Sequence, residues 1–159
     1  MVSLHLWKIS LQPITDNYIV SILYIHTNMK VKNGFKYKKN GWTFPDYDTH
    51  FAYMLDKNIR KGGEPVYQEP VRRKSFQFVQ HKGLALDIGA NIGLWTRDMA
   101  KQFQRVIAFE PVADFRECLR ENVDMSQVAI RDYALGNENT TIDMVITPDN
   151  TGHSHVNTD

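Results

Sequence analysis

Hydrophobic and polar residues settle into a regular rhythm in the second half of the chain. Short apolar runs predict buried strands, and apolar residues that recur every three or four positions predict helices between them. This alternation of strands and helices is typical of an α/β fold with a parallel sheet. A last segment alternates apolar and polar residues, which predicts an antiparallel strand with one solvent-facing side. The predicted strands cover 84–88, 105–109, 127–131 and 141–146, and the predicted helices cover 94–103 and about 111–123.

The first half of the chain has no clean period, and we expect an N-terminal extension over 1–74 followed by a domain over 75–159. Asn33-Gly34 lies between two lysine-rich stretches and predicts a hairpin, because an Asn-Gly pair favours the tight turn that joins antiparallel strands. Further predicted elements are a short helix capped by Asp48 or Thr49 and ending near Asp56, a loop over 57–75, and a strand over Ser75–Gln80.

Composition and charge exclude several broad classes of function. The 159 residues carry a formal net charge of +1, so no overall field favours nucleic acid or an anionic membrane as a partner. The basic run Arg72-Arg73-Lys74 is expected to be solvated. The longest apolar run, Tyr18–Ile25, is far shorter than the roughly 18 residues that a membrane-spanning helix needs. A single cysteine, Cys118, forms no internal disulfide and fits a reducing compartment, so we expect a cytoplasmic protein.

The candidate chemistry lies just after the first predicted strand, in the turn Asp87-Ile88-Gly89-Ala90-Asn91-Ile92-Gly93. A strand, a glycine-rich turn and a helix in this order present helix N-terminal N–H groups to a ligand. Gly89 and Gly93 permit a tight turn and a close approach of the backbone. Glu110 ends the second strand, at about the spacing from the turn at which a carboxylate accepts the hydroxyl protons of a ribose.

Two phosphate-binding alternatives are disfavoured by the same turn. The dinucleotide fingerprint G-x-G-x-x-G would place glycine where this chain has Asn91 and Leu94, and the Gly-Lys-Ser/Thr of a P-loop does not follow. An anion at Asp87 would repel a pyrophosphate but would favour the ammonium of a bound amino acid. S-adenosylmethionine carries an amino-acid end and a sulfonium, so the charges favour it over a nicotinamide cofactor.

Three motifs in combination resemble the FkbM-type methyltransferases. They are Asp-x-Gly-Ala-Asn-x-Gly from Asp87, Phe109-Glu110-Pro111, and Tyr133-Ala134-Leu135-Gly136. The resemblance covers about residues 75–156, roughly half of the chain. It implies a Rossmann-like class I methyltransferase fold with S-adenosyl-L-methionine as the cofactor. It also implies transfer of a methyl group to a hydroxyl of a sugar, a glycan or another hydroxylated small molecule.

The resemblance further implies which residues contact the cofactor. The turn after the first strand would surround the methionine end, Glu110 would hold the ribose, and the segment Asp132-Tyr133-Ala134 would lie by the adenine. The implied cofactor-binding residues are Asp87, Gly89, Ala90, Asn91, Gly93, Glu110, Pro111, Asp132, Tyr133 and Ala134.

The methyl acceptor benefits from a general base, because its oxygen must lose a proton as it attacks. Asp132 and His153 are the candidates near the expected cleft. His153 and His155 lie two residues apart with no third ligand in register, so no metal is expected. Three apolar residues at helical spacing, Trp95, Met99 and Phe103, are interpreted as helix core.

The family pattern continues past this chain with a further strand, typically reading like Lys-Ile-Asp-x-Glu-Gly, that lies beside the first strand. No such segment occurs here, so we expect a C-terminally truncated chain in which 84–88 is an apolar sheet edge. The alternative to an active methyltransferase is therefore a non-catalytic cofactor-binding fragment or remnant that lacks the second half of the site. Met29 is a candidate for the true start, and the oligomeric state is left open.

Overall fold

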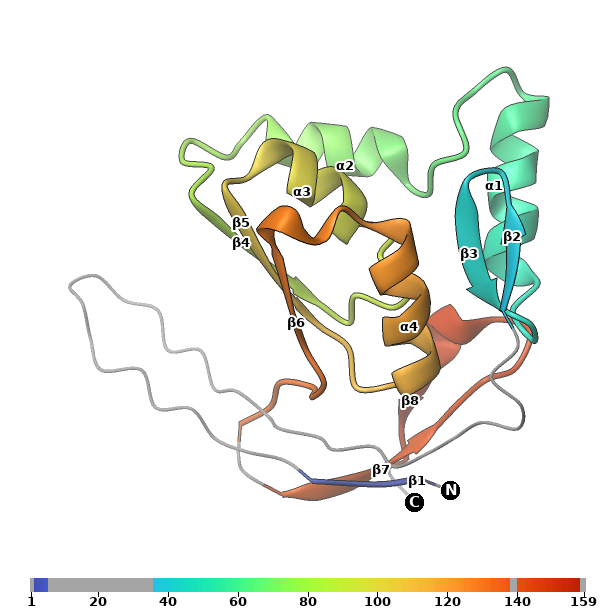
Figure 1. Cartoon of the computed structure of the whole chain (residues 1–159), viewed down its shortest axis with the longest axis vertical. Helices are drawn as coiled ribbons and strands as arrows, with labels where there is room; N and C mark the ends of the chain where they lie inside the picture. Colours follow the sequence, from blue (N-terminus) through green and yellow to red (C-terminus); the bar gives the residue numbers. More distant parts are fainter. Residues whose placement is uncertain (1, 6–35, 138–139, 158–159) are drawn as a thin grey trace.

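The computed structural model describes residues 2–5, 36–137 and 140–157. It contains helices, short strands and two single 3-10 turns, drawn in Figure 1 in the colours of the sequence. In chain order the elements are β1 (Val2–His5), β2 (Lys36–Lys39), β3 (Trp42–Pro45), α1 (His50–Arg60), α2 (Glu69–Phe76), β4 (Leu84–Ile88), α3 (Thr96–Gln102), β5 (Arg105–Phe109), α4 (Ala113–Asn122), η1 (Met125–Gln127), β6 (Val128–Arg131), β7 (Thr141–Val145), η2 (Thr151–His153) and β8 (His155–Val156).

Three strands form a parallel sheet in the order β4-β5-β6. The register of the first pair runs from Leu84 opposite Arg105 to Ile88 opposite Phe109, so the carboxyl ends of both strands meet at one edge. Helices α3 and α4 supply the crossovers between the strands. The prediction of an α/β fold with three parallel strands is confirmed.

Among the described elements, the helices cover one face of this sheet, and the opposite face of β4 carries exposed apolar side chains. Ala85, Val106 and Ala108 point into a core that also contains residues of α3 and α4. On the opposite face of β4, Leu84 is 54% exposed and Ile88 is 60% exposed. Among the described residues β4 is hydrogen-bonded to β5 alone, which agrees with the apolar sheet edge expected from the sequence.

A second, antiparallel sheet lies apart from the parallel one, at the lower edge of Figure 1. Strand β7 lies at its centre and pairs with β1 on one side and β8 on the other. The antiparallel strand predicted for 141–146 is therefore confirmed. Its pairing with β1 joins the N-terminal extension to the end of the chain.

The hairpin of the extension forms at the second Asn-Gly pair of the lysine-rich segment. Asn40 (φ 52°) and Gly41 (φ 74°) both take left-handed conformations between β2 and β3, as a two-residue hairpin turn requires. The hairpin predicted at Asn33-Gly34 lies outside the described residues, as do Met29 and the Tyr18–Ile25 run.

The hairpin and α1 pack on the other elements and position the site. The Asn122 side chain of α4 accepts from Thr43 N (2.6 Å) and donates to Thr43 O (2.9 Å), which pairs the edge of β3 as another strand would. A core cluster joins this layer to the glycine turn and α4, and its members are Trp42, Phe44, Phe51, Ala52, Leu55, Ile92, Leu94 and Cys118.

Around helix α2 the structure differs from two of the sequence predictions. The loop predicted over 57–75 is confirmed for 61–68 but is wrong at both ends, because α1 extends to Arg60 and Glu69–Phe76 is helical with a proline in its first turn. The strand predicted over 75–80 is wrong. Arg72, which we expected to be solvated, is only 2% exposed and pairs with Asp98 of α3 (2.7 Å). Burial of Arg72 and the packing of the partly buried Phe76 on Phe103 therefore anchor a helix whose composition is otherwise polar.

Other boundaries differ by a few residues. Helix α1 starts at the predicted cap, where Asp48 Oδ1 accepts from Phe51 N (3.1 Å), but it continues past Asp56 to Arg60. Helix α4 begins at Ala113, so Pro111 precedes the helix rather than lying in its first turn. Among the described helices, none is long and apolar enough to cross a membrane.

Candidate functional site

The glycine turn lies where β4 and β5 end. Gly89 (φ 77°), Asn91 (φ 50°) and Gly93 (φ 91°) all take left-handed conformations. The N–H groups of Gly89 and Ala90 both donate to Phe109 O, at 2.9 and 3.0 Å. These bonds fix the turn against the end of β5, so that its open side faces the crevice beyond the strand ends.

The two glycines of the turn have different roles. A Cβ on Gly89 would meet no atom within 4 Å, and Gly89 lines the pocket described below. A Cβ on Gly93 would lie 2.8 Å from Val123 Cγ2 and 3.2 Å from Leu119 Cγ. Gly89 is therefore required for its backbone conformation on the ligand side, and Gly93 for close packing of the turn against α4.

Asp87 is a buried carboxylate at the floor of the site. It is 8% exposed, and its Oδ2 accepts from Thr96 Oγ1 (2.5 Å) at the start of α3. Burial raises the pKa of the Asp87 carboxyl, although the Thr96 hydrogen bonds and the positive charge of Arg72 lower it. The effect of burial therefore outweighs these partners, and a cation in the adjoining pocket would stabilise the Asp87 carboxylate further.

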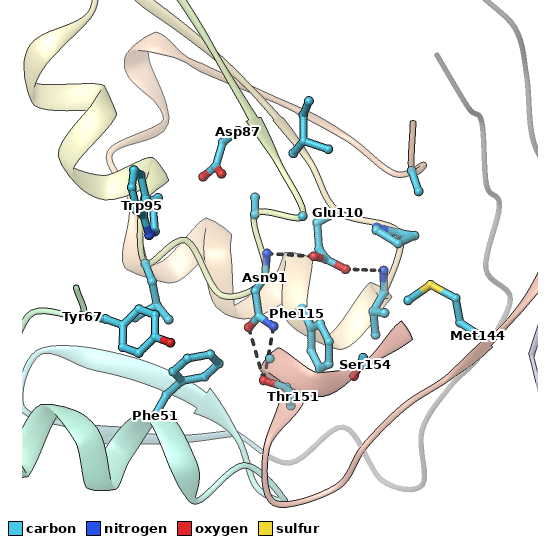
Figure 2. Close-up of a pocket in the computed structure, with 18 of the residues that line it drawn as sticks. Phe51, Tyr67, Asp87, Asn91, Trp95, Glu110, Phe115, Met144, Thr151 and Ser154 are labelled. Carbon is cyan, nitrogen blue, oxygen red and sulfur yellow. Dashed lines mark hydrogen bonds between the residues drawn. The ribbon is translucent and has the colours of Figure 1, made fainter. Parts of the chain in front are cut away.

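Glu110 joins the two loops at the strand ends. One carboxylate oxygen accepts from Asn91 N and the other from Val112 N, each at 2.8 Å (Figure 2). The residue is 4% exposed and lines the pocket. It therefore holds the glycine turn and the loop before α4 in one arrangement, in addition to any contact with a ligand.

We expect the pH dependence of stability to report on Glu110. Burial raises the pKa of this carboxyl to about 7, against the opposing effect of the two backbone N–H donors. Between pH 4.5 and 7 the folded chain then holds a proton that the unfolded chain has lost. The free energy of unfolding should consequently fall as pH rises through this range, by up to about 3 kcal/mol.

Urea unfolding at a series of pH values measures this effect. Glu110→Gln, which does not titrate, should show a flatter profile than the parent chain over the same range. The buried Asp87, whose pKa is also raised, should leave a residual slope of the same sign in the variant. Glu121 carries the opposite shift, because Lys36 lowers its pKa, and it titrates below this window. Identical profiles of variant and parent would contradict the assignment.

Asn91 links the turn to two distant segments. Its side-chain Oδ1 accepts from Ile92 N (2.8 Å). Its Nδ2 donates to Thr151 Oγ1 (3.3 Å), as Figure 2 shows. Thr151, 2% exposed, in turn donates through its N–H to Asp48 Oδ2 (3.1 Å) and through its hydroxyl to the same oxygen. The extension and the C-terminal hairpin thus meet on the glycine turn.

These segments enclose a pocket of about 480 Å³. Aromatic side chains of Phe51, Tyr67 and Trp95 form one side of it, and Met144, Thr151 and Ser154 lie on another (Figure 2). Asp87 and Glu110 are the two charged residues of the described lining, which holds no lysine, arginine or histidine. The pocket is therefore suited to a neutral or cationic ligand with apolar parts, and poorly suited to phosphate groups.

Most of the predicted cofactor residues line this pocket. The predicted residues that line it are Asp87, Gly89, Ala90, Asn91, Glu110, Pro111 and Ala134. Gly93 packs on α4 instead, and Tyr133 is buried against Phe109 with ring centroids 5.5 Å apart. Asp132 is half-buried and outside the lining, and its charge acts on Arg116.

His153 is exposed and does not line the pocket, although its neighbours Gly152 and Ser154 do. Its carbonyl accepts from Thr147 Oγ1 (3.3 Å) and contacts His155 Nδ1 (2.9 Å). Within the described ranges, no three His, Cys, Asp or Glu side chains gather as a metal site would require. The role of His153 as a base stays a prediction.

The N-terminal side of the pocket was missed by the sequence argument. Trp95, interpreted as helix core, lies before α3, lines the pocket and donates through Nε1 to Gln68 Oε1 (3.1 Å). Phe51 and Tyr67 meet edge to face with centroids 5.0 Å apart. The aromatic richness of 42–56 was visible in the sequence, but nothing in it indicated that these rings would face the glycine turn.

No protein-family model and no curated protein matches the chain. Among solved structures it is similar to a putative S-adenosylmethionine-dependent methyltransferase from Listeria monocytogenes, with 11% identity, a TM-score of 0.34, and coverage of 42% of this chain and 33% of that chain. It is also similar to wild-type Trm5b from Pyrococcus abyssi, with 19% identity, a TM-score of 0.38, and coverage of 83% and 36%. The chain spans about a third of the length of these two structures.

Proposed function

We propose that the pocket binds S-adenosylmethionine and that the chain belongs to a methyltransferase. The observation that carries the proposal is the charge of the described lining, in which Asp87 and Glu110 face the cavity beside a glycine turn and no cation is present. The cofactor brings an ammonium, a sulfonium and one carboxylate, so its net charge is +1, and its two positive groups are attracted by the two carboxylates of the pocket. A dinucleotide would instead bring a pyrophosphate, which the same carboxylates repel.

In this proposal each carboxylate has one part of the cofactor to hold. Asp87 attracts the ammonium of the methionine end. Glu110 accepts the ribose hydroxyls, because each carboxylate oxygen has two lone pairs and the backbone N–H groups of Asn91 and Val112 use one on each side. Ala134 and Leu135, with Met144 opposite, offer apolar surface for the adenine.

The proposed reaction is transfer of the methyl group to a hydroxyl oxygen of a sugar, glycan or other small molecule. The bound cofactor supplies an electrophilic methyl group, and the protein must mainly orient the acceptor and exclude water. The faces of Tyr67 and Trp95 are surfaces on which an acceptor with apolar C–H groups can rest. His153 is the proposed base, with Asp132 as the second candidate.

A second candidate function is cofactor binding without transfer. It is favoured by the positions of His153 and Asp132, neither of which lines the pocket in the described part of the chain. Incubation of the chain with methyl-labelled S-adenosylmethionine and a panel of sugars and glycans separates the two. Label on an acceptor supports the methyltransferase, and cofactor binding with no labelled product supports the binding module.

A further inference from the structure

A second hollow of about 430 Å³ lies between α2 and α3, and we call it the α2–α3 groove. The two helices lie side by side in Figure 1 and are joined by the Arg72–Asp98 pair. The groove shares no lining residue with the pocket at the glycine turn. Its chemistry is also the reverse of that pocket, because its charged lining is predominantly basic. The charged residues are Glu69, Arg72, Arg73, Lys82, Asp98 and Lys101.

Arg72 is the buried member of the groove lining and is incompletely paired. Its Nε and Nη2 both bind Asp98 Oδ2, at 3.0 and 2.7 Å. Its Nη1 is buried and has no hydrogen-bond partner among the described residues. A buried guanidinium N–H without an acceptor is unfavourable, since the group has lost its water and gained nothing in return. Because this atom has no accessible surface, it adds positive charge beneath the groove and is not a donor that a bound ligand can reach.

The exposed cations of the groove are available to bind an anionic ligand. Arg73 and Lys101 have side chains that are 73% and 66% exposed, and each has one carboxylate partner, Glu69 at 3.4 Å and Asp98 at 3.3 Å. Such exposed pairs are weak and readily rearranged. With Lys82, the groove has four basic and two acidic side chains and therefore a formal excess of two positive charges.

We propose that the α2–α3 groove binds the phosphate group of a small phosphomonoester. A phosphomonoester carries a charge of about −1.5 to −2 at pH 7 and three acceptor oxygens, which match the charge excess of the groove and its exposed donors better than a single carboxylate does. The amides of Gln77 and Gln102 line the groove and offer further donors. A polyanion is a poorer fit, because the formal net charge of the chain is only +1.

Titration of β-glycerophosphate into the full chain at constant ionic strength, followed by 31P NMR, tests the proposal. We expect saturable binding of one molecule per chain. Arg73→Gln and Lys101→Gln should each weaken it roughly three- to fivefold. Arg60→Gln removes a comparable exposed cation on α1, outside the groove, and should leave the affinity unchanged. These surface variants avoid the risk that replacing the buried Arg72 unfolds the chain.

Three results would overturn the proposal. The first is an absence of saturable binding, and the second is an equal loss of affinity in Arg60→Gln. The third is an affinity for a single-stranded oligonucleotide that equals or exceeds the affinity for the ester. Binding of S-adenosylhomocysteine by Arg73→Gln should match the parent chain, because the groove and the pocket are separate. The groove result is thus independent of the proposed methyltransferase function.

Discussion

Replacing Glu110 by alanine is expected to weaken S-adenosylhomocysteine binding by about a hundredfold or more. Two ribose hydroxyls lose a charged acceptor, at roughly 1.5–3 kcal/mol each. In the parent chain the N–H groups of Asn91 and Val112 donate to this carboxylate, and in the variant they would lose that partner. The free energy of unfolding should consequently fall by about 2–4 kcal/mol. Isothermal titration calorimetry gives the affinity, and circular dichroism shows whether the variant is folded at the temperature used.

The matched control is Glu117→Ala, which removes an acid of α4 whose side chain is 55% exposed and outside the pocket lining. Its affinity for the same ligand should equal that of the parent chain. Glu110→Gln keeps the shape and one acceptor oxygen and should lose less affinity than the alanine variant. If folded Glu110→Ala binds as tightly as the parent, Glu110 does not hold the ribose.

Gly93→Ala is expected to destabilise the fold by about 3 kcal/mol or more. The new Cβ would lie 2.8 Å from Val123 Cγ2. The alanine backbone would also have to keep φ at 91°. Left-handed backbone costs an L-residue roughly 1–2 kcal/mol, and overpacking of a close contact adds roughly 1–3 kcal/mol. Urea denaturation measures the loss as a shift of the midpoint.

Gly89→Ala is the comparison that separates packing from backbone conformation. Gly89 also has a positive φ, but a Cβ there would meet no atom within 4 Å. Its unfolding free energy should fall only by the backbone cost, about 1–2 kcal/mol. Because Gly89 lines the pocket, its substitution should affect ligand binding more than stability. Equal destabilisation by both substitutions would contradict the different roles assigned to the two glycines.

The parallel sheet could be predicted from the sequence because each strand is a compact apolar run with clear polar or glycine boundaries. LALDI and RVIAF match β4 and β5 residue for residue. Helix α2 could not, because its anchoring depends on Arg72 binding Asp98 of another element, and a polar run with two arginines has the composition of a loop. In 75–80 the alternating SFQFVQ reflects the end of a helix packed on Phe103 rather than a strand.

The candidate site, too, could be predicted from the sequence only in part. The glycine turn and Glu110 are local features of one βαβ unit, so their spacing in the sequence predicts their proximity. The opposite side of the pocket depends on contacts between residues far apart in the chain. Asp48 and Thr151, for example, are separated by 103 positions and meet at the turn. No local periodicity carries that information, because it depends on how α1 and the C-terminal hairpin pack.

The central claim is that the pocket binds S-adenosylmethionine and not a dinucleotide, because its described lining holds two carboxylates and no cationic side chain. Calorimetric titration of the full chain with S-adenosylhomocysteine and, separately, with NAD tests it most directly, at about pH 8, where Glu110 is ionised. We expect saturable binding of one S-adenosylhomocysteine per chain and no measurable binding of NAD. Binding of NAD with equal or higher affinity, or no binding of S-adenosylhomocysteine by the folded chain, would contradict the account.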